Sequence, residues 1–379
     1  MAGKILRVAL IGCGRIAAKH IMAITKKNSG LLLCAVADTA PGAFDKVFDS
    51  CKLSLKRKHQ IKKTVKTYAG YHEMLDREKP DITSITAPSG LHYSIAKAAM
   101  LSGSHILLEK PMSMKASQAR ELRDISEQTN RRIAMGHIFR YFPVVGNLQK
   151  DVAAGRFGKI SHGSVIVRWG HDQAYYGQAS WRGTWKHDGG VLMNQCVHAI
   201  DLICWLMNGN AIAANAMISK RFHDMEAEDI ALGTLKLDNG ALCQIEGTTN
   251  SPPGDHEAAF YLLGEKGGFR MGIRRGRPYF DIRINGKKKN LEYFMKEIRS
   301  RGLSSLLSLT NPHAGIYADL RGAILNGKYP IADAKSGMMS VESVLALYLS
   351  AKEKKQITIP LAKDFSSQEM SEYSFGSMS

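Results

Sequence analysis

A glycine-rich turn near the N-terminus limits the possible folds of this chain more than any other feature. The apolar stretch RVALI runs directly into GCGRIA, in which Gly12, Gly14 and Ala17 fill a Gly-x-Gly-x-x-Gly/Ala pattern. The first glycine of such a pattern permits a tight turn, the second lets the backbone approach a pyrophosphate, and the small third residue allows close helix–strand packing. The pyrophosphate lies at the helix N-terminus, so the motif predicts a dinucleotide site that also includes Arg15 and Ile16.

A carboxylate follows at the spacing expected for a ribose ligand. Asp38 ends the second apolar stretch, LLLCAVA, 24 residues after Gly14. At that position it would accept hydrogen bonds from the ribose hydroxyls of NAD and repel the additional phosphate of NADP. The alternative is an ordinary turn aspartate after a strand. Because Thr39 rather than an arginine follows, the sequence predicts NAD as the cofactor, with NADP less favoured.

The first third of the chain alternates short apolar stretches with segments of helical period. Five stretches are predicted strands: RVALIG, LLLCAVAD, DITSITAP, SHILLEKP and RRIAMGH. Strands that alternate with helices of this length form parallel βαβ units with right-handed crossovers. We therefore predict an α/β protein whose residues 1–137 form a doubly wound Rossmann domain.

The pattern changes after residue 138. A helix around 143–154 precedes long strand-like stretches, and Asp-Asn-Gly at 238–240 is a strong hairpin signal. With one further helix at 190–207, these features predict an α+β domain over 138–363 with a large, mostly antiparallel, open-faced sheet. Helices near 313–326 and 340–354 are expected to pack back on the body, and 364–379 is expected to be a flexible tail.

Composition limits the class of protein. Hydrophobic residues make up 44% and charged residues 23% of the chain, which is typical of a compact globular protein. The N-terminus lacks the pattern of a signal peptide, and no apolar run is long enough to span a bilayer, so the expected location is the cytoplasm. The six cysteines are scattered without ligand spacing, which predicts reduced thiols and no metal site.

The formal net charge of +18 is concentrated in two segments. Residues 52–66 carry seven Lys or Arg and no acid, and a second basic region spans 270–301. Such segments can attract nucleic acid or an anionic substrate, or they can be solvated surface. Neither contains the interleaved aromatic residues of nucleic-acid modules, so we predict surface and neither a nucleic-acid nor a membrane partner.

Further segments carry a resemblance to a known family. They are, in order, APSGLH, LLEKPMS, GHIFRYFP, WRGTWKHDGGVLMNQCVHAIDLICWL and ADLRGAILNGKYPIADAKSG. Over nearly its whole length the chain resembles the Gfo/Idh/MocA family of glucose-fructose oxidoreductases, inositol dehydrogenases and related sugar dehydrogenases. The resemblance implies an NAD-dependent enzyme that transfers a hydride between nicotinamide and a secondary hydroxyl of a sugar.

By that resemblance Lys110 is the active-site lysine, close to both the nicotinamide ribose and the substrate hydroxyl. An ammonium in a partly desolvated cleft can relay a proton or stabilise a developing alkoxide. The resemblance also assigns Pro88, His92 and Glu109, together with Lys110, to the cofactor site.

The segment of the second domain that contains NQCVHAID supplies the other implied catalytic groups. Asn194 and His198 are four residues apart, so on a helix they project from one face, and Asp201 continues that face. His198 is the expected general base, because imidazole titrates near neutral pH. Many family members carry an aspartate in place of Asn194. Asparagine at this place most resembles the UDP-N-acetylhexosamine (or uronic acid) 3-dehydrogenase branch, where it would orient the substrate or cofactor by hydrogen bonds.

The resemblance places five more residues near the ligands. Trp181 and Arg182 are expected to approach the cofactor, and Arg168, Tyr175 and Tyr176 to contact the substrate. Arginine forms bidentate hydrogen bonds with phosphate, and aromatic rings stack on sugars.

Three alternatives remain open. The substrate can be a free polyol such as inositol, or a free monosaccharide, instead of a nucleotide sugar. The chain can also be a non-catalytic NAD-binding regulator, since fold alone does not establish chemistry.

An open-faced sheet would need cover, and pairing of sheets between subunits predicts a homodimer or homotetramer.

Overall fold

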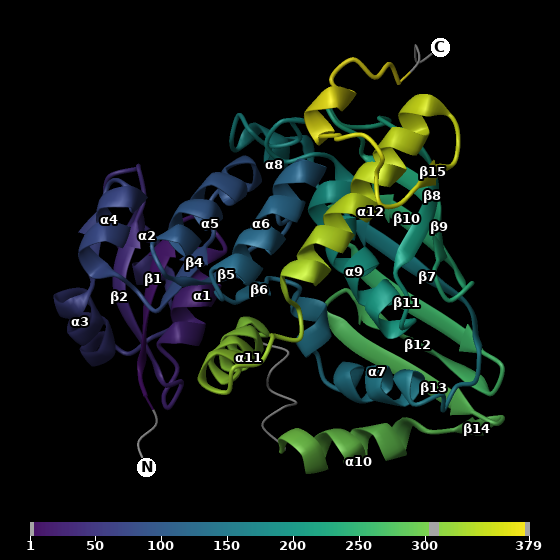
Figure 1. The fold of residues 1–379 in the computed structure, drawn as a ribbon, viewed down its shortest axis with the longest axis horizontal. Helices are drawn as coiled ribbons and strands as arrows, with labels where there is room; N and C mark the ends of the chain where they lie inside the picture. Colours follow the sequence, from purple (N-terminus) through teal and green to yellow (C-terminus); the bar gives the residue numbers. More distant parts are fainter. Residues whose placement is uncertain (1–3, 303–310, 376–379) are drawn as a thin grey trace. The chain divides into compact units, whose positions relative to one another are not determined.

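The computed structural model describes residues 4–302 and 311–375, and the chain forms two compact units (Figure 1). Unit 1 comprises residues 4–113, 118–141 and 311–337, and unit 2 comprises residues 114–117, 142–302 and 338–375. Each unit contains one β-sheet. The chain therefore returns to unit 1 after most of unit 2 has been built.

Unit 1 is built on a parallel sheet of six strands in the order β3-β2-β1-β4-β5-β6. This is the doubly wound order, and it confirms the predicted Rossmann sheet. The strand order reverses between β1 and β4, which pair in parallel, so a crevice for a dinucleotide is expected at the carboxyl ends of these strands. The strands are β1 (Leu6–Ile11), β2 (Leu31–Ala37), β3 (Lys66–Tyr68), β4 (Ile82–Ile85), β5 (His105–Leu108) and β6 (Ile133–Met135).

The helices of unit 1 connect these strands. Helix α11 lies beside α1, although about 290 residues separate them in the sequence. Within the described residues no helix has both the length and the apolar character needed to cross a membrane. The helices are α1 (Ala17–Ile24), α2 (Ala43–Ser50), α3 (Leu55–Thr64), α4 (Tyr71–Glu78), η1 (Ser89–Leu91), α5 (His92–Leu101), α6 (Ala116–Gln128), η2 (Ile138–Tyr141) and α11 (His313–Leu325).

The basic segment 52–66 forms α3, in which no residue is buried, and leads into β3, an edge strand that we did not predict. Two of its lysines have acidic partners. Lys62 forms ion pairs with Asp45 (2.8 Å) and Asp49 (3.1 Å) of α2, and Lys66 pairs with Glu78 of α4 at 2.8 Å. Part of the positive charge is thus compensated within unit 1.

Unit 2 contains a nine-stranded mixed sheet, ordered β14-β13-β12-β11-β7-β10-β9-β8-β15. Among the described strands of unit 2, β7 and β10 alone pair in parallel, so the predicted mostly antiparallel sheet is confirmed. The predicted hairpin joins β9 to β10, with Gly240 at φ +85° in the turn. The strands are β7 (Ile160–Trp169), β8 (Ala211–Ser219), β9 (Ile230–Leu237), β10 (Leu242–Thr248), β11 (His256–Gly264), β12 (Gly267–Arg274), β13 (Arg277–Ile284), β14 (Lys287–Lys288) and β15 (Ile357–Thr358).

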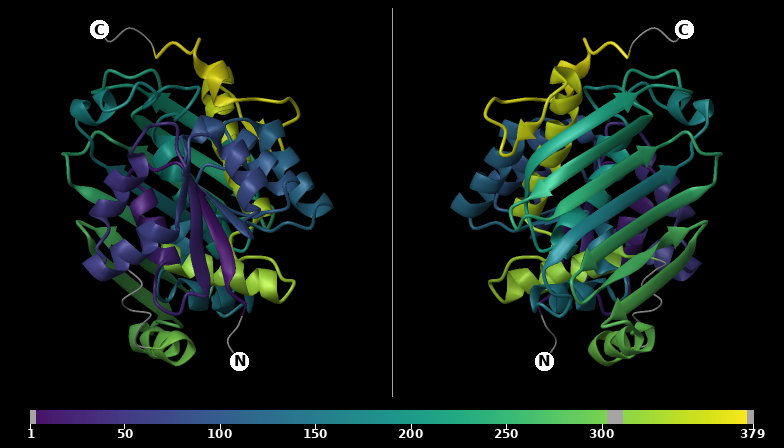
Figure 2. Two further views of the ribbon diagram at one scale, coloured as in Figure 1. Left: turned by 90° about the vertical axis from the view of Figure 1, so that its left-hand side faces the viewer. Right: turned by 90° about the vertical axis from the view of Figure 1, so that its right-hand side faces the viewer.

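One face of this sheet is covered by helices. A Cβ at Gly247 of β10 would meet Cys196 Sγ, and one at Gly233 of β9 would meet Leu347, so η3 and α12 lie on this face. The opposite, outer face is seen directly in the right-hand view of Figure 2. The helices are α7 (Val145–Ala153), α8 (Gln173–Gly177), η3 (Leu192–Cys196), α9 (Val197–Leu206), α10 (Asn290–Arg301), α12 (Ala334–Glu353) and η5 (Ser367–Met370).

The C-terminal segment differs from the flexible tail that the sequence predicts. Asp364 accepts hydrogen bonds from the backbone N–H and the hydroxyl of Ser117, both at 2.9 Å, and pairs with Lys115. A capping box between Ser366 and Glu369 begins η5. The start of this segment is therefore held by contacts of Asp364 with residues about 250 positions earlier, which a local pattern does not reveal, and 376–379 lie outside the described residues.

Candidate active site

The glycine-rich turn of unit 1 connects β1 to α1. Gly12 has φ +92°, and a Cβ there would lie 2.7 Å from the backbone nitrogen of Ala87, so only glycine fits this close approach to the end of β4. A Cβ at Gly14 would meet nothing within 4 Å, which leaves open space beside the turn. Arg15 is exposed and Ile16 half-buried next to it. This combination of a tight turn and open space fits the pyrophosphate of a dinucleotide.

Asp38 lies at the same turn. Its Oδ2 accepts the backbone N–H of Cys13 at 2.6 Å, and its Oδ1 accepts the N–H of Ala40 at 2.8 Å. Thr39 is exposed beside it. Burial, and then the negative charge of Asp38, raise the pKa of the Cys13 thiol to about 12, so this thiol is neutral at physiological pH. The turn thus presents a fixed carboxylate where the sequence predicts the ribose.

His92 holds two loops of unit 1 together. Its Nδ1 lies 2.6 Å from the carbonyl oxygen of Pro111, and its Nε2 lies 2.9 Å from that of Ala87. Burial lowers the pKa of His92, although both carbonyls oppose this shift. Because both ring nitrogens face the backbone, His92 fixes the loops at Pro88 and Lys110 rather than offering a nitrogen to a ligand. Lys110 itself is half-buried, two residues after the end of β5.

Glu109, for which the sequence predicts a cofactor contact, is instead turned into the interior of unit 1. Its Oε1 lies 3.1 Å from His20 Nε2 and 3.4 Å from His313 Nε2. Burial alone would raise the pKa of Glu109, but hydrogen bonds from the two histidines hold it well below its usual value. The side-chain nitrogen and oxygen atoms of these three residues lie within 4.8 Å of one another, close enough to hold a metal ion.

The buried cluster also has an outer partner, Asn311. Asn311 Nδ2 donates to the carbonyl oxygen of Lys19, so its Oδ1 is the atom that faces His313 Nδ1 at 3.2 Å. His313 therefore faces an oxygen acceptor at each ring nitrogen, Asn311 on one side and Glu109 on the other. The members of this cluster lie on α1, directly after β5 and on α11, and only packing brings these segments together, so a local sequence pattern does not predict it.

In unit 2, Asn194 and His198 lie on consecutive segments. Asn194 is in η3, which is a π-helix rather than the α-helix that the sequence predicts, and His198 is in the first turn of α9. Both are half-buried within a largely buried segment, whereas Asp201 is buried. Asn194 Nδ2 donates to Asp188, whose other oxygen accepts the backbone N–H of Gly183 at 2.9 Å. Asp188, which we did not predict, thus fixes the orientation of the Asn194 amide.

The aromatic residues that follow β7 gather around Arg182. The Arg182 guanidinium lies 4.2 Å from the ring centre of Tyr175 and 5.0 Å from that of Trp181. Tyr176 is buried instead, and its hydroxyl donates to Thr249 Oγ1 at 3.1 Å. Three residues predicted to contact a ligand, Tyr175, Trp181 and Arg182, thus lie together in unit 2, whereas Tyr176 points into the interior.

Arg168, which the resemblance places near the substrate, lies on the face of the sheet opposite to η3. Val165 and Val167 of β7 are buried, so by strand alternation Arg168 points to the outer face of the sheet. There it pairs with Glu246 at 2.6 Å and Glu257 at 3.4 Å, and these carboxylates compensate its charge.

The fold and these side chains define the class of protein: a dinucleotide-binding oxidoreductase with a Rossmann sheet and a second sheet that carries further polar groups. The chain belongs to the Gfo/Idh/MocA family. Residues 6–137 match its NAD-binding Rossmann fold, described as an oxidoreductase family, and residues 146–270 match its C-terminal domain. These matches confirm the predicted family and cofactor.

Two solved structures are similar over nearly the full length. The WlbA dehydrogenase of Bordetella pertussis, in complex with NADH and UDP-GlcNAcA, is 27% identical with a TM-score of 0.82, covering 95% of this chain and 99% of that one. The WlbA dehydrogenase of Chromobacterium violaceum, solved with the same ligands, is 28% identical with a TM-score of 0.78, covering 96% and 98%.

A curated relative has a different substrate in its name. An inositol 2-dehydrogenase/D-chiro-inositol 3-dehydrogenase of Lactiplantibacillus plantarum is 26% identical over 206 residues, which cover 54% of this chain and 53% of that protein. The chain spans 60% and 53% of the lengths of the first curated relatives that it matches.

Proposed function

We propose that this protein is an NAD-dependent dehydrogenase that oxidises a secondary hydroxyl of a sugar, at carbon 3 of a nucleotide sugar. The similarity to the two WlbA dehydrogenases, over at least 95% of this chain, is the observation that carries the proposal. Asn194 and its anchor Asp188 support the same branch, because an amide held by a carboxylate has a fixed orientation for hydrogen bonding.

In this proposal NAD, when bound, supplies the hydride acceptor. His198 accepts the proton of the substrate hydroxyl at an imidazole nitrogen. Lys110 donates a hydrogen bond to the same oxygen and so stabilises the negative charge that develops there. Asn194 orients the sugar and the ring of Tyr175 stacks on it, while Arg182, whose guanidinium lies against that ring, provides positive charge for the cofactor.

A panel of substrates tests the proposal. The formation of reduced nicotinamide is followed by absorbance with UDP-hexosamines, UDP-uronic acids, inositols and free hexoses. Turnover with a UDP-linked sugar is the expected result. Turnover with inositols alone would favour the second candidate, to which the Lactiplantibacillus plantarum relative points. If no sugar is oxidised while NAD still binds, the non-catalytic regulator becomes the better hypothesis.

Changing the ribose ligand is expected to shift cofactor preference. Asp38→Asn keeps an oxygen for the N–H of Cys13 but removes the charge, and Thr39→Arg adds a partner for a 2′-phosphate. The double variant should lower kcat/KM for NAD by roughly 10- to 100-fold, since hydrogen bonds to charged groups contribute about 1.5–3 kcal/mol, and raise it for NADP. Thr39→Arg alone is the control. An unchanged ratio of the two kcat/KM values would remove Asp38 from the ribose site.

We also propose that two copies of the chain associate through the outer face of the unit 2 sheet. Met217 (79% exposed) and Leu232 (51%) are cross-strand neighbours there, and Leu242 (56%) lies on the same face. Burial of such a patch is favourable. Leu232→Lys should lower the molar mass measured by light scattering to that of one chain. Leu325→Lys, at an exposed leucine of α11 in unit 1, should leave it unchanged.

A further inference from the structure

Glu228 is a wholly buried acid for which the proposed mechanism has no use. It lies just before β9, and its side chain reaches the start of the helical segment that carries Asn194. A Cβ at Gly190 would lie 2.0 Å from Glu228 Oε2, so glycine is the residue that leaves room for this acid.

Glu228 and Tyr348 of α12 satisfy four consecutive backbone N–H groups at 190–193. Glu228 Oε1 accepts the N–H of Leu192 at 2.8 Å, and the Glu228 carbonyl accepts that of Val191 at 3.1 Å. The Tyr348 hydroxyl accepts the N–H groups of Gly190 (3.2 Å) and Met193 (3.3 Å) and donates to Glu228 Oε1 at 2.9 Å. The first four N–H groups of a helix have no partner within it, so Glu228 and Tyr348 cap the start of this helix.

The surroundings of Glu228 favour its neutral form. Within the described residues Oε2 has no hydrogen-bond partner, and a bare buried carboxylate oxygen is costly. The titratable groups that face it are Tyr348 of α12, Cys196 of η3 and the adjacent Asp229, and none of these three is a cation. Burial raises the pKa of Glu228 to about 8, although the Leu192 N–H opposes this shift.

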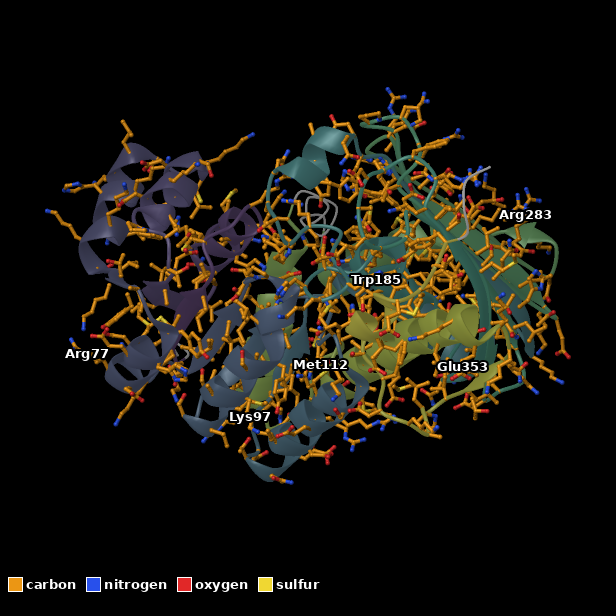
Figure 3. The ribbon with its side chains drawn as sticks, turned by 90° about the horizontal axis from the view of Figure 1, so that it is seen from above. Arg77, Lys97, Met112, Trp185, Arg283 and Glu353 are labelled. Carbon is orange, nitrogen blue, oxygen red and sulfur yellow. The ribbon has the colours of Figure 1, made fainter. Side chains whose placement is uncertain are left out.

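Packing holds Tyr348 in place. Trp185, labelled in Figure 3, packs edge-on against its ring with centroids 5.2 Å apart, and both side chains are buried. Tyr348 therefore cannot turn away when Glu228 changes its charge without losing this contact.

We infer that Glu228 is a positioning residue: its protonated form holds the 190–193 turn, and thereby Asn194 in η3, in the arrangement that turnover requires. Loss of its proton places an uncompensated charge in the interior, and that charge can be hydrated only if the turn opens. Asn194 lies only two residues after Leu192, so opening of the turn would move the side-chain amide of Asn194. This role rests on the proposed function only for the measurement of turnover.

Glu228→Gln tests the inference, because glutamine keeps an oxygen for Leu192 and Tyr348 but cannot ionise. At pH 7 its kcat should lie within about threefold of the wild type, and the fall in wild-type kcat above about pH 8 should be reduced. Glu297→Gln is a matched control at another buried glutamate, which accepts the N–H of Val144, and it should keep the wild-type pH profile. An alkaline limb that is identical in Glu228→Gln and the wild type would overturn the inference.

Two readouts do not depend on activity. Because the pKa of Glu228 is raised, the wild-type protein loses stability as pH rises from about 4.5 to about 8. The difference in Tm between Glu228→Gln and the wild type should therefore increase across that range and stay constant above it. Amide hydrogen exchange at pH 9 should be slower at 190–193 in Glu228→Gln than in the wild type. Equal exchange, or a Tm difference that does not change with pH, would overturn the positioning role even if no substrate is found.

Discussion

Lys110→Met is expected to lower kcat by about 10²- to 10⁴-fold, the range typical of losing a general acid–base group, while the Kd for NAD changes little. Methionine has a similar length but carries no charge and no proton. In the proposed mechanism the ammonium of Lys110 stabilises the oxygen of the reacting hydroxyl, an interaction that is strongest in the transition state, so its loss lowers kcat more than it raises KM.

Lys97→Met is a matched control for this variant. Lys97 lies in the same unit, on α5, and pairs with Glu121 of α6 at 2.6 Å. Its removal should leave kcat near the wild-type value. Turnover that survives in Lys110→Met would exclude an acid–base role for the lysine, and loss of NAD binding, measured by calorimetry, would make it a cofactor ligand instead.

Glu109→Leu is expected to destabilise unit 1 by about 3–5 kcal/mol, the range found when one partner of a buried ion pair is removed. The change leaves His20 and His313 buried without the carboxylate that their Nε2 atoms face. Urea unfolding at pH 7 measures the effect. Glu127→Leu, at an exposed position of α6, should change stability by less than about 0.5 kcal/mol. A loss below about 1 kcal/mol in Glu109→Leu would contradict a buried charged pair.

The same cluster predicts that acid destabilises the protein. Burial lowers the pKa of His20, so protonating this histidine destabilises the folded protein. Its contribution to stability is complete above about pH 6.5 and is lost as pH falls. The pKa of Glu109 is also lowered, so its contribution is present above about pH 4.5 and is lost below it. The unfolding free energy of the wild type should therefore decrease from about pH 6.5 downward, and the Leu variant should lack the part that comes from Glu109.

The features that could be predicted from the sequence have local determinants. Gly12 adopts a positive φ that glycine accommodates, and the alternation of apolar strands and helices determines a doubly wound sheet. Asp38 directly follows β2 and Lys110 lies two residues after β5, so their positions near the strand ends follow from chain connectivity. The hairpin at Asp238–Gly240 depends on only a few residues.

The directions of several side chains could not be predicted. Glu109 and Lys110 are neighbours in the sequence, yet the carboxylate turns inward because α1 and α11 place two histidines behind it. The side of the sheet to which Arg168 points depends on which face of β7 the helices cover. The N–H groups just before Asn194 likewise take their partners from Glu228 and Tyr348, which lie 34 and 154 residues further along the chain.

The sequence by itself determined the family, the two sheets and the residues at the ends of the dinucleotide-binding strands, because turns, caps and periodic burial depend on interactions between near neighbours. Only the tertiary structure decided which acids are buried, which way their pKa values shift and which face of the second sheet carries Asn194 and His198. Protonation depends on desolvation and on partners from distant segments, and those are set when the elements pack.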